Sequence, residues 1–231
     1  MQEFIIFANA MTEKKSFSFN LGDLVWSDVW FAMGYRGGIP EPSIRQMAEE
    51  VAERIVPGSV VRCMYRTLPA SKLSATEVMI GDVRFAPQGI ICSYLDGMDQ
   101  ACVFVGTAGA EFASKVKELN AEGNIVADFI ADSIGTVLAE YAVKKVEEDF
   151  ASVPNHSMSY SPGYCNWDIR EQKKLFSLFP PCPCGITLTE SSLMMPEKSV
   201  SGFLAMGAEL VRQPYHCEIC KNKKCYKRRE G

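Results

Sequence analysis

Hydrophobic and polar residues follow two distinct patterns in the first half of the chain. Residues 44–55 lie between two prolines and place apolar side chains at helical intervals, which predicts a helix. From Ser59, apolar and polar residues alternate, which is typical of a half-buried strand. Shorter runs of the same kind at 77–80 and 101–105 predict further strands, so this half of the chain should form a sheet.

Helical periodicity returns after these strands. Residues 110–120 and 125–149 predict two helices joined by a tight turn at Gly123. On the longer helix, Val126 and Ile130 belong to an apolar stripe that should face the core.

The last third of the chain is predicted to contain one more helix and two more strands. Asp168 and Glu171 occupy the first and fourth positions of a capping box, so a helix is expected over 168–179. Residues 186–190 and 199–204 read as strands. Because strands and helices are largely segregated along the chain, the expected fold class is α+β.

Composition narrows the range of functions. The chain has 231 residues, of which 47% are hydrophobic, and its formal net charge is -4, so a basic surface for nucleic acid is not expected. An apolar run at Phe4–Phe7 is too short to span a bilayer and has no basic region before it, so we expect a cytoplasmic protein. We predict one domain over 1–213 and a short basic, cysteine-bearing tail over 214–231.

The cysteines suggest metal binding. Nine are present without a secretion signal, so reduced thiols or metal ligands are expected rather than disulfides. Cys217, Cys220 and Cys225 have the spacing C-x2-C-x4-C, and Cys182 and Cys184 supply two more thiols. An iron-sulfur cluster, a zinc ion and no metal all remain open, because the spacing is not that of a standard ferredoxin.

The other cysteines suggest packing. Cys63, Cys92 and Cys102 lie in apolar runs and are expected in the core. Cys165 follows a tyrosine in a turn and is either ligand-facing or buried.

Three motifs follow one another between residues 158 and 207. They are Ser161-Pro-Gly-Tyr164-Cys-Asn-Trp167, Gly185-Ile-Thr-Leu-Thr-Glu-Ser191 and Met195-Pro-Glu-Lys-Ser-Val-Ser-Gly202. Their order and spacing resemble those of the activation domain of vitamin B12 (cobalamin)-dependent methionine synthase. Weaker similarity extends to residues 131–140 and 34–36.

The resemblance implies a fold and a function. The fold would be a twisted antiparallel sheet with flanking helices. The domain would bind S-adenosylmethionine and offer its methyl group to cobalamin that has drifted to the inactive cob(II) state and is being reduced. The remaining residues leave no room for a cobalamin module, so the partner would be the cobalamin-binding module of a separate methionine synthase or related corrinoid methyltransferase. The chain would serve a methyltransferase system without being a complete enzyme.

The first motif has a physical reading of its own. Pro162-Gly163 sets a turn, and a glycine lets a ligand approach the backbone closely. Ser161 and Tyr164 flank this turn, and the tyrosine offers both a flat ring and a hydroxyl to a nucleoside or corrin. The alternative is a purely structural corner.

Carboxylates are expected near the sulfonium and ammonium groups of S-adenosylmethionine. Asp128, Asp132 and Glu140 lie on or beside one face of the 125–149 helix with Gly135 among them, and the alternative for Asp128 is a solvent-exposed helix face. A glycine inside a helix favours close packing or a ligand. Glu190 is a further candidate, although it also suits the cap of a turn.

One residue of the family pattern is missing. The family has an arginine shortly before Pro-Gly-Tyr that engages the ligand carboxylate, but the equivalent position here is Ser159. Serine cannot copy the bidentate grip of a guanidinium. Arg36, Arg170 and Lys198 are candidates to replace it from elsewhere in the fold.

Two other functions remain open from the sequence. One is an iron-sulfur or zinc-binding redox or interaction protein that keeps the fold without binding S-adenosylmethionine. The other is an interaction module that binds only a corrinoid protein.

Overall fold

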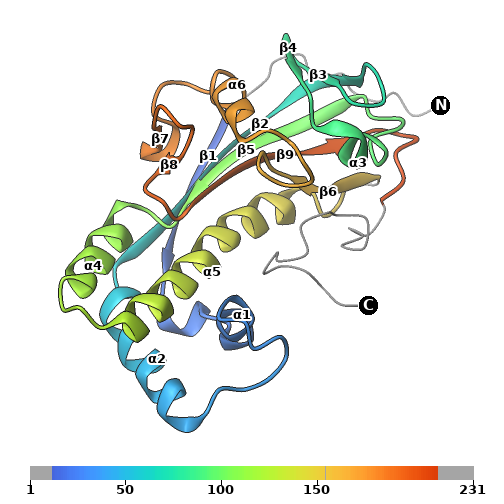
Figure 1. Cartoon of the computed structure of the whole chain (residues 1–231). Helices are drawn as coiled ribbons and strands as arrows, with labels where there is room; N and C mark the ends of the chain where they lie inside the picture. Colours follow the sequence, from blue (N-terminus) through green and yellow to red (C-terminus); the bar gives the residue numbers. More distant parts are fainter. Residues whose placement is uncertain (1–11, 154, 213–231) are drawn as a thin grey trace.

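A seven-stranded sheet organises residues 12–153 and 155–212, which the computed structural model describes (Figure 1). All its strand pairs are antiparallel. In chain order the elements are β1 (Thr12–Phe19), the 3₁₀ helix Leu21–Asp23, α1 (Trp26–Ala32), α2 (Pro42–Ile55), β2 (Ser59–Lys72), β3 (Val78–Ile80), β4 (Val83–Phe85), α3 (Gln88–Cys92), β5 (Gln100–Thr107), α4 (Ala110–Asn120), α5 (Ile125–Asp149), β6 (His156–Tyr160), the 3₁₀ helix Ile169–Glu171, α6 (Gln172–Phe176), the 3₁₀ helix Pro183–Gly185, β7 (Thr187–Leu188), β8 (Met194–Met195) and β9 (Ser199–Met206).

The strand order places the last strand of the described chain inside the sheet. The order is β4-β3-β2-β5-β9-β6, and β1 also pairs with β2. β9 therefore lies between β5 and β6, with Thr107 opposite Ser199 on one side and Tyr160 opposite Phe203 on the other. β6 forms an outer edge of the sheet, and β7 and β8 make a separate hairpin.

Alternation along the strands produces two hydrophobic cores, one on each face of the sheet. The 25-residue helix α5 lies across one face with α1, α2 and α4 around its first half (Figure 1). Phe104 and Leu204 face this core, while their neighbours Val103 and Phe203 face the second core. The second core is covered by α3, α6 and the segment that contains Trp167.

Most of the predicted architecture is confirmed. The fold is α+β with an antiparallel sheet and flanking helices, and the helices expected over 44–55, 110–120 and 125–149 are present as α2, α4 and α5. Strands cover 77–80 and 101–105 in large part, and strands also occur within 186–190 and 199–204. Strand β6 was not predicted, because its sequence His-Ser-Met-Ser-Tyr has little aliphatic character.

Two local predictions were wrong. Val126 is 43% exposed, because the buried face of α5 centres on residues such as Ile130, Ile134 and Leu138. The predicted 168–179 helix is a 3₁₀ turn followed by α6, which ends at Phe176. Asp168 does cap the turn by accepting a hydrogen bond from the Arg170 amide, but Glu171 completes no capping box because its carboxylate binds other donors.

Within the described ranges, no helix is both long enough and apolar enough to cross a bilayer.

The contact between α5 and the sheet yields a stability prediction. A Cβ at Gly106 would lie 2.6 Å from the Cβ of Ala142 and 3.4 Å from Val200 Cγ1. Gly106→Ala should therefore lower the free energy of unfolding in urea by about 1–3 kcal/mol, the usual cost of overpacking. Gly22→Ala is the matched control, since nothing lies within 4 Å of a Cβ there. Equal stability of the two variants would contradict this packing.

Candidate functional site

The first and third sequence motifs meet where β6 ends beside β9. A Cβ at Gly202 would lie 3.0 Å from Ser161 Oγ and 2.9 Å from Phe104 Cζ, and it would also collide with the Tyr160 carbonyl oxygen. Only glycine allows β6 and β9 to approach this closely at that point. Ser161 is therefore fixed against β9 on the face that carries α5.

The segment after Ser161 is a compact turn closed by its own backbone. The Tyr164 amide donates to the Ser161 carbonyl at 3.2 Å, and the Gly163 amide donates to the Trp167 carbonyl at 2.8 Å. Gly163 has φ +93°, and Cys165 and Asn166 also have positive φ. The φ angle of Gly163 is unfavourable for any residue with a side chain, so the turn requires glycine at this position. Tyr164 is half-buried in the turn, so part of its surface is accessible.

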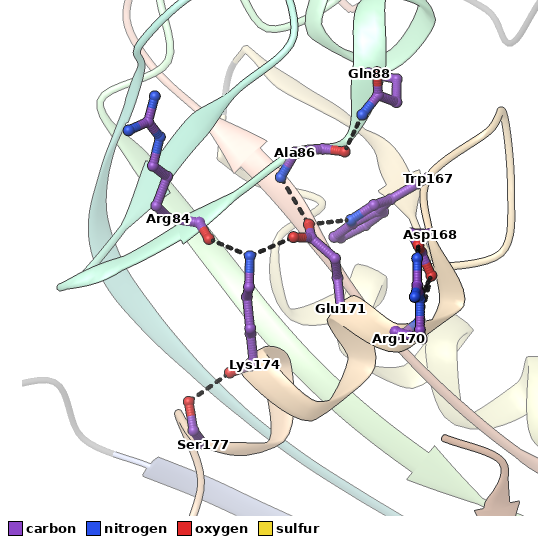
Figure 2. A network of polar contacts seen from close by, with 9 residues as sticks. All are labelled: Arg84, Ala86, Gln88, Trp167, Asp168, Arg170, Glu171, Lys174 and Ser177. Carbon is purple, nitrogen blue, oxygen red and sulfur yellow. Dashed lines mark hydrogen bonds and ion pairs between the residues drawn. The ribbon is translucent and has the colours of Figure 1, made fainter. Parts of the chain in front are cut away.

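Trp167 anchors the turn in the second core. Its side chain is 1% exposed and makes edge contacts with Phe85 and Phe203, at centroid distances of 6.1 and 5.5 Å. The indole donates to Glu171 Oε2 at 2.8 Å, and the Ala86 amide donates to the same oxygen at 2.7 Å (Figure 2). Lys174 forms an ion pair with the other oxygen of Glu171.

The hydrogen bonds and the ion pair around Glu171 stabilise the charged form of its carboxyl. Burial raises the pKa of its carboxyl, but the ammonium of Lys174, the Ala86 amide and the Trp167 indole outweigh this effect, and the pKa is lowered. The adjoining surface depression has a volume of about 450 Å³. Its cations Arg170 and Lys174 are already paired with Asp168 and Glu171, so the network serves to hold the turn.

The carboxylates Asp128, Asp132 and Glu140 form the acidic stripe of α5. Through Asp132, this stripe contacts Lys198, the residue that leads into β9. Lys198 Nζ lies 2.7 Å from Asp132 Oδ1 and donates to Thr136 Oγ1 at 3.1 Å. A Cβ at Gly135 would lie 2.7 Å from Lys198 Cγ and 2.8 Å from Phe112 Cε1. Side chains of Lys198 and Phe112 thus fill the space beside Gly135. Of the two roles that the sequence left open for this glycine, close packing and ligand binding, the structure favours close packing.

Glu140 continues the same stripe. It lies one turn beyond Thr136 and is half-buried. Farther along α5, Ala142 packs against Gly106 beside Val200 of β9. α5 thus lies against Lys198, which precedes β9, and then near Val200 at the start of β9. Val200 is two residues before Gly202, where Ser161 contacts β9. Asp128 lies at the opposite end of the stripe and is also half-buried.

Glu190 lies apart from these carboxylates. It is exposed in the turn between β7 and β8, and its backbone carbonyl accepts a hydrogen bond from Lys173 of α6 at 2.8 Å. The hairpin lies beside α6, on the other face of the sheet from α5 (Figure 1). The structure therefore groups Asp132, Glu140 and Ser161 on one face and places Glu190 on the other.

The candidate metal ligands differ in accessibility. Cys182 is exposed, whereas Cys184 is 8% exposed in the second core, and burial raises the pKa of the Cys184 thiol to about 11. Cys217, Cys220 and Cys225 lie outside the described residues. Among the residues that are described, no cluster of His, Cys, Asp or Glu is suited to hold a metal.

The remaining thiols lie in the interior. Cys63, Cys92 and Cys102 are fully buried, as predicted, and Cys165 is 5% exposed in the second core, which favours the packing role left open for it.

The candidate replacements for the family arginine are placed differently. Ser159 lies in β6 opposite Leu204. Arg170 Nε donates to both carboxylate oxygens of Asp168, at 3.0 and 2.9 Å, and Lys198 is paired with Asp132. Arg36 lies in the turn between α1 and α2, next to Tyr35, which lines an apolar depression with Val126 at the start of α5.

A fourth cationic side chain lies near the position of the missing family arginine, and sequence reasoning missed it. Arg212 lies against β6, where Nη1 is 2.8 Å from His156 Nε2 and Nη2 is 3.5 Å from Met158 Sδ. No sequence motif signals this contact, because it depends on the chain returning to β6 after β9.

The antiparallel sheet with one long helix across a face, and the motifs that meet at β6 and β9, define an α+β domain of a known class. The chain belongs to the family described as vitamin B12 dependent methionine synthase, activation domain, whose sequence model matches residues 90–231. This confirms the family suggested by the sequence motifs.

A solved structure supports the fold. The chain is similar to the MetH reactivation domain, which was solved as a crystal structure of that domain bound to AdoHcy. The TM-score is 0.63 at 14% sequence identity, and the match covers 90% of this chain and 81% of that chain. A search of curated protein sequences found no significant match.

The Glu171 network predicts a pH-dependent contribution to stability. The pKa of Glu171 is lowered on folding, so its stabilisation is full above the unfolded value of about 4.3 and is lost as pH falls through the folded value. Glu171→Gln should reduce the free energy of unfolding at neutral pH by about 1–3 kcal/mol, and the deficit should shrink below about pH 4. Exposed Glu197→Gln is the control. A deficit that stays constant down to pH 3 would argue against this role for the carboxylate.

Proposed function

We propose that this chain binds S-adenosylmethionine and presents its methyl group to a corrinoid cofactor held by a partner protein. The observation that carries the proposal is the meeting of the first and third family motifs where β6 ends beside β9. Ser161 touches β9 at Gly202, and the acidic stripe of α5 contacts the residue that leads into β9. Family membership and the AdoHcy bound to the similar MetH domain support the same ligand class.

The chemistry of the ligand suggests a role for each side chain. S-adenosylmethionine combines a flat adenine, a sulfonium and an amino acid group. The half-buried ring of Tyr164 is suited to stack on the adenine, and the turn at Ser161 and Gly163 offers backbone groups nearby. Glu140 and Asp132 would favour the cationic sulfonium and ammonium groups, with Asp132 shared with Lys198.

The proposed reaction needs little covalent work from the protein. S-adenosylmethionine supplies its methyl group to the reduced corrinoid cobalt and leaves as S-adenosylhomocysteine. The side chains of this chain bind and orient the donor, and the carboxylates of α5 stabilise its positive charge before transfer. As the charge leaves with the methyl group, the attraction to these carboxylates weakens.

The proposed partner is the cobalamin-binding module of a methionine synthase or related corrinoid methyltransferase. Family membership implies such a module. We place it on a separate polypeptide, so that this chain acts as an accessory reactivation protein. Glu190 lies on the other face of the sheet, so the proposed ligand site on the α5 face does not include it.

A second candidate function rests on the cysteines. Cys182 is exposed, whereas Cys184 is buried. An iron-sulfur cluster or zinc ion held by the tail and Cys182 would make the chain a redox or interaction protein on the same fold.

Binding of S-adenosylmethionine tests the primary proposal. Calorimetric titration should show saturable binding, and Tyr164→Ala should weaken it by about tenfold or more, since a base stacked on an aromatic ring contributes about 1–3 kcal/mol. Tyr164→Phe keeps the ring and should retain most of the affinity. Absence of heat, at concentrations where a methionine synthase activation domain binds the ligand, would contradict the proposal.

Metal analysis tests the second candidate. After anaerobic purification, the protein should contain iron and sulfide, or zinc, and Cys220→Ser and Cys182→Ser should each lower the metal content. Cys63→Ala, which alters a buried thiol in the core, should leave the content unchanged. A colourless and metal-free wild-type protein would eliminate this function.

A further inference from the structure

We propose that the start of α5, with the neighbouring ends of α1 and α2, forms a surface on which a second copy of this chain docks about a twofold axis. The proposal does not depend on ligand binding. It starts from Ile125 and Phe129, which lie one turn apart on α5 and are 82% and 49% exposed. Exposed apolar side chains that gather on one surface are typical of protein–protein contacts.

An apolar depression adjoins these two side chains. It has a volume of about 220 Å³ and is lined by Met33, Gly34, Tyr35, Ile44, Val126 and Phe129. These residues come from the end of α1, the start of α2 and the first turns of α5, and both shorter helices contact α5 (Figure 1). Since a cavity of about 150 Å³ can hold benzene, the depression has room for an isoleucine side chain. The surface thus carries both a projecting apolar group and a hollow that can receive one.

Charges of opposite sign flank these two features. Val126 borders the depression, and Asp128 lies about 200° farther round the helix. The exposed side chains of Ile125 and Phe129 therefore lie between Val126 and Asp128. On α2, Arg45 is exposed and directly follows a residue that lines the depression. The ion pairs of the described chain include neither Asp128 nor Arg45.

This order of features is self-complementary. An anion, the projecting apolar pair, the depression and a cation follow one another across the surface. A twofold rotation places the projecting pair of each copy at the depression of the other, and Asp128 of each copy opposite Arg45 of the other. A different protein would need no such match within a single surface, so the shape and the charges favour a second copy as the occupant.

The surface is separate from the junction of β6, β9 and α5. Glu140 follows Phe129 by eleven residues of α5, which is about 16 Å along the helix axis. A second copy at the start of α5 therefore leaves the Glu140 end of the helix available to a ligand and to a corrinoid partner.

The mass of the protein in solution tests the proposal. Light scattering after gel filtration should give twice the mass of the 231-residue chain. Ile125→Asp should raise the dissociation constant of the dimer by about 100-fold or more, because both copies lose an apolar contact and bury a charge. Leu73→Asp is the matched control and should stay dimeric, since Leu73 is 45% exposed between β2 and β3.

Two charge variants test the twofold arrangement. Arg45→Asp and Asp128→Arg should each dimerise poorly alone, because each places like charges opposite one another. Mixed in equal amounts they should form a dimer, since each copy then supplies the charge that the other needs. Native mass spectrometry identifies the mixed dimer, and thermal unfolding shows that each variant is folded.

Three results would overturn the proposal. They are a monomeric wild-type chain at about 100 μM, a dimer that Ile125→Asp does not weaken, and no mixed dimer from the two charge variants. A monomeric chain that binds the cobalamin-binding module of a methionine synthase, and loses that binding in Ile125→Asp, would also overturn it, because the partner protein would then be the occupant of this surface.

Discussion

The close approach of β9 to its neighbours is the constraint on which the rest of the structure depends. β9 lies between β5 and β6, and two glycines in β5 and β9 lack the side chains that would hold neighbouring elements away from this part of the sheet. Gly202 admits the end of β6, and Gly106 admits α5 against the sheet. Backbone packing of this kind tolerates no extra methyl group without movement of a strand or of the long helix. Gly135 extends the same contact to the Lys198 side chain.

This packing joins parts of the chain that are distant in sequence. The turn at Tyr164 is fixed on one side by Ser161 against β9 and on the other by Trp167 in the second core. Glu171 reinforces Trp167 through a buried network that links the turn to Ala86 (Figure 2). The candidate ligand surface therefore lies on regular elements and a tightly closed turn, and such support lets weakly populated backbone conformations persist.

Sequence periodicity predicted the helices well because α2 and α4 each bury one side, and α5 carries buried apolar residues at helical spacing along its length. It missed β6, whose serines give no hydrophobic alternation, and it misread Glu171 as a capping residue because the Ala86 amide that binds its carboxylate comes from a segment distant in sequence. Ser161, Gly163 and Tyr164 were predicted from their motif, and their role in ligand binding stays a prediction. Arg212 has no motif, and only the return of the chain to β6 brings it there. The tail thiols lie outside the described residues, so their metal site stays a prediction.

The central claim is that the junction of β6, β9 and α5 forms the ligand site of this activation domain. The most direct test is a crystal structure of the chain in complex with S-adenosylhomocysteine. Our account predicts ligand density beside Tyr164 and Ser161, on the face of the sheet that carries Glu140. Density at the β7–β8 hairpin near Glu190, or in the depression lined by Arg170 and Lys174, would contradict it.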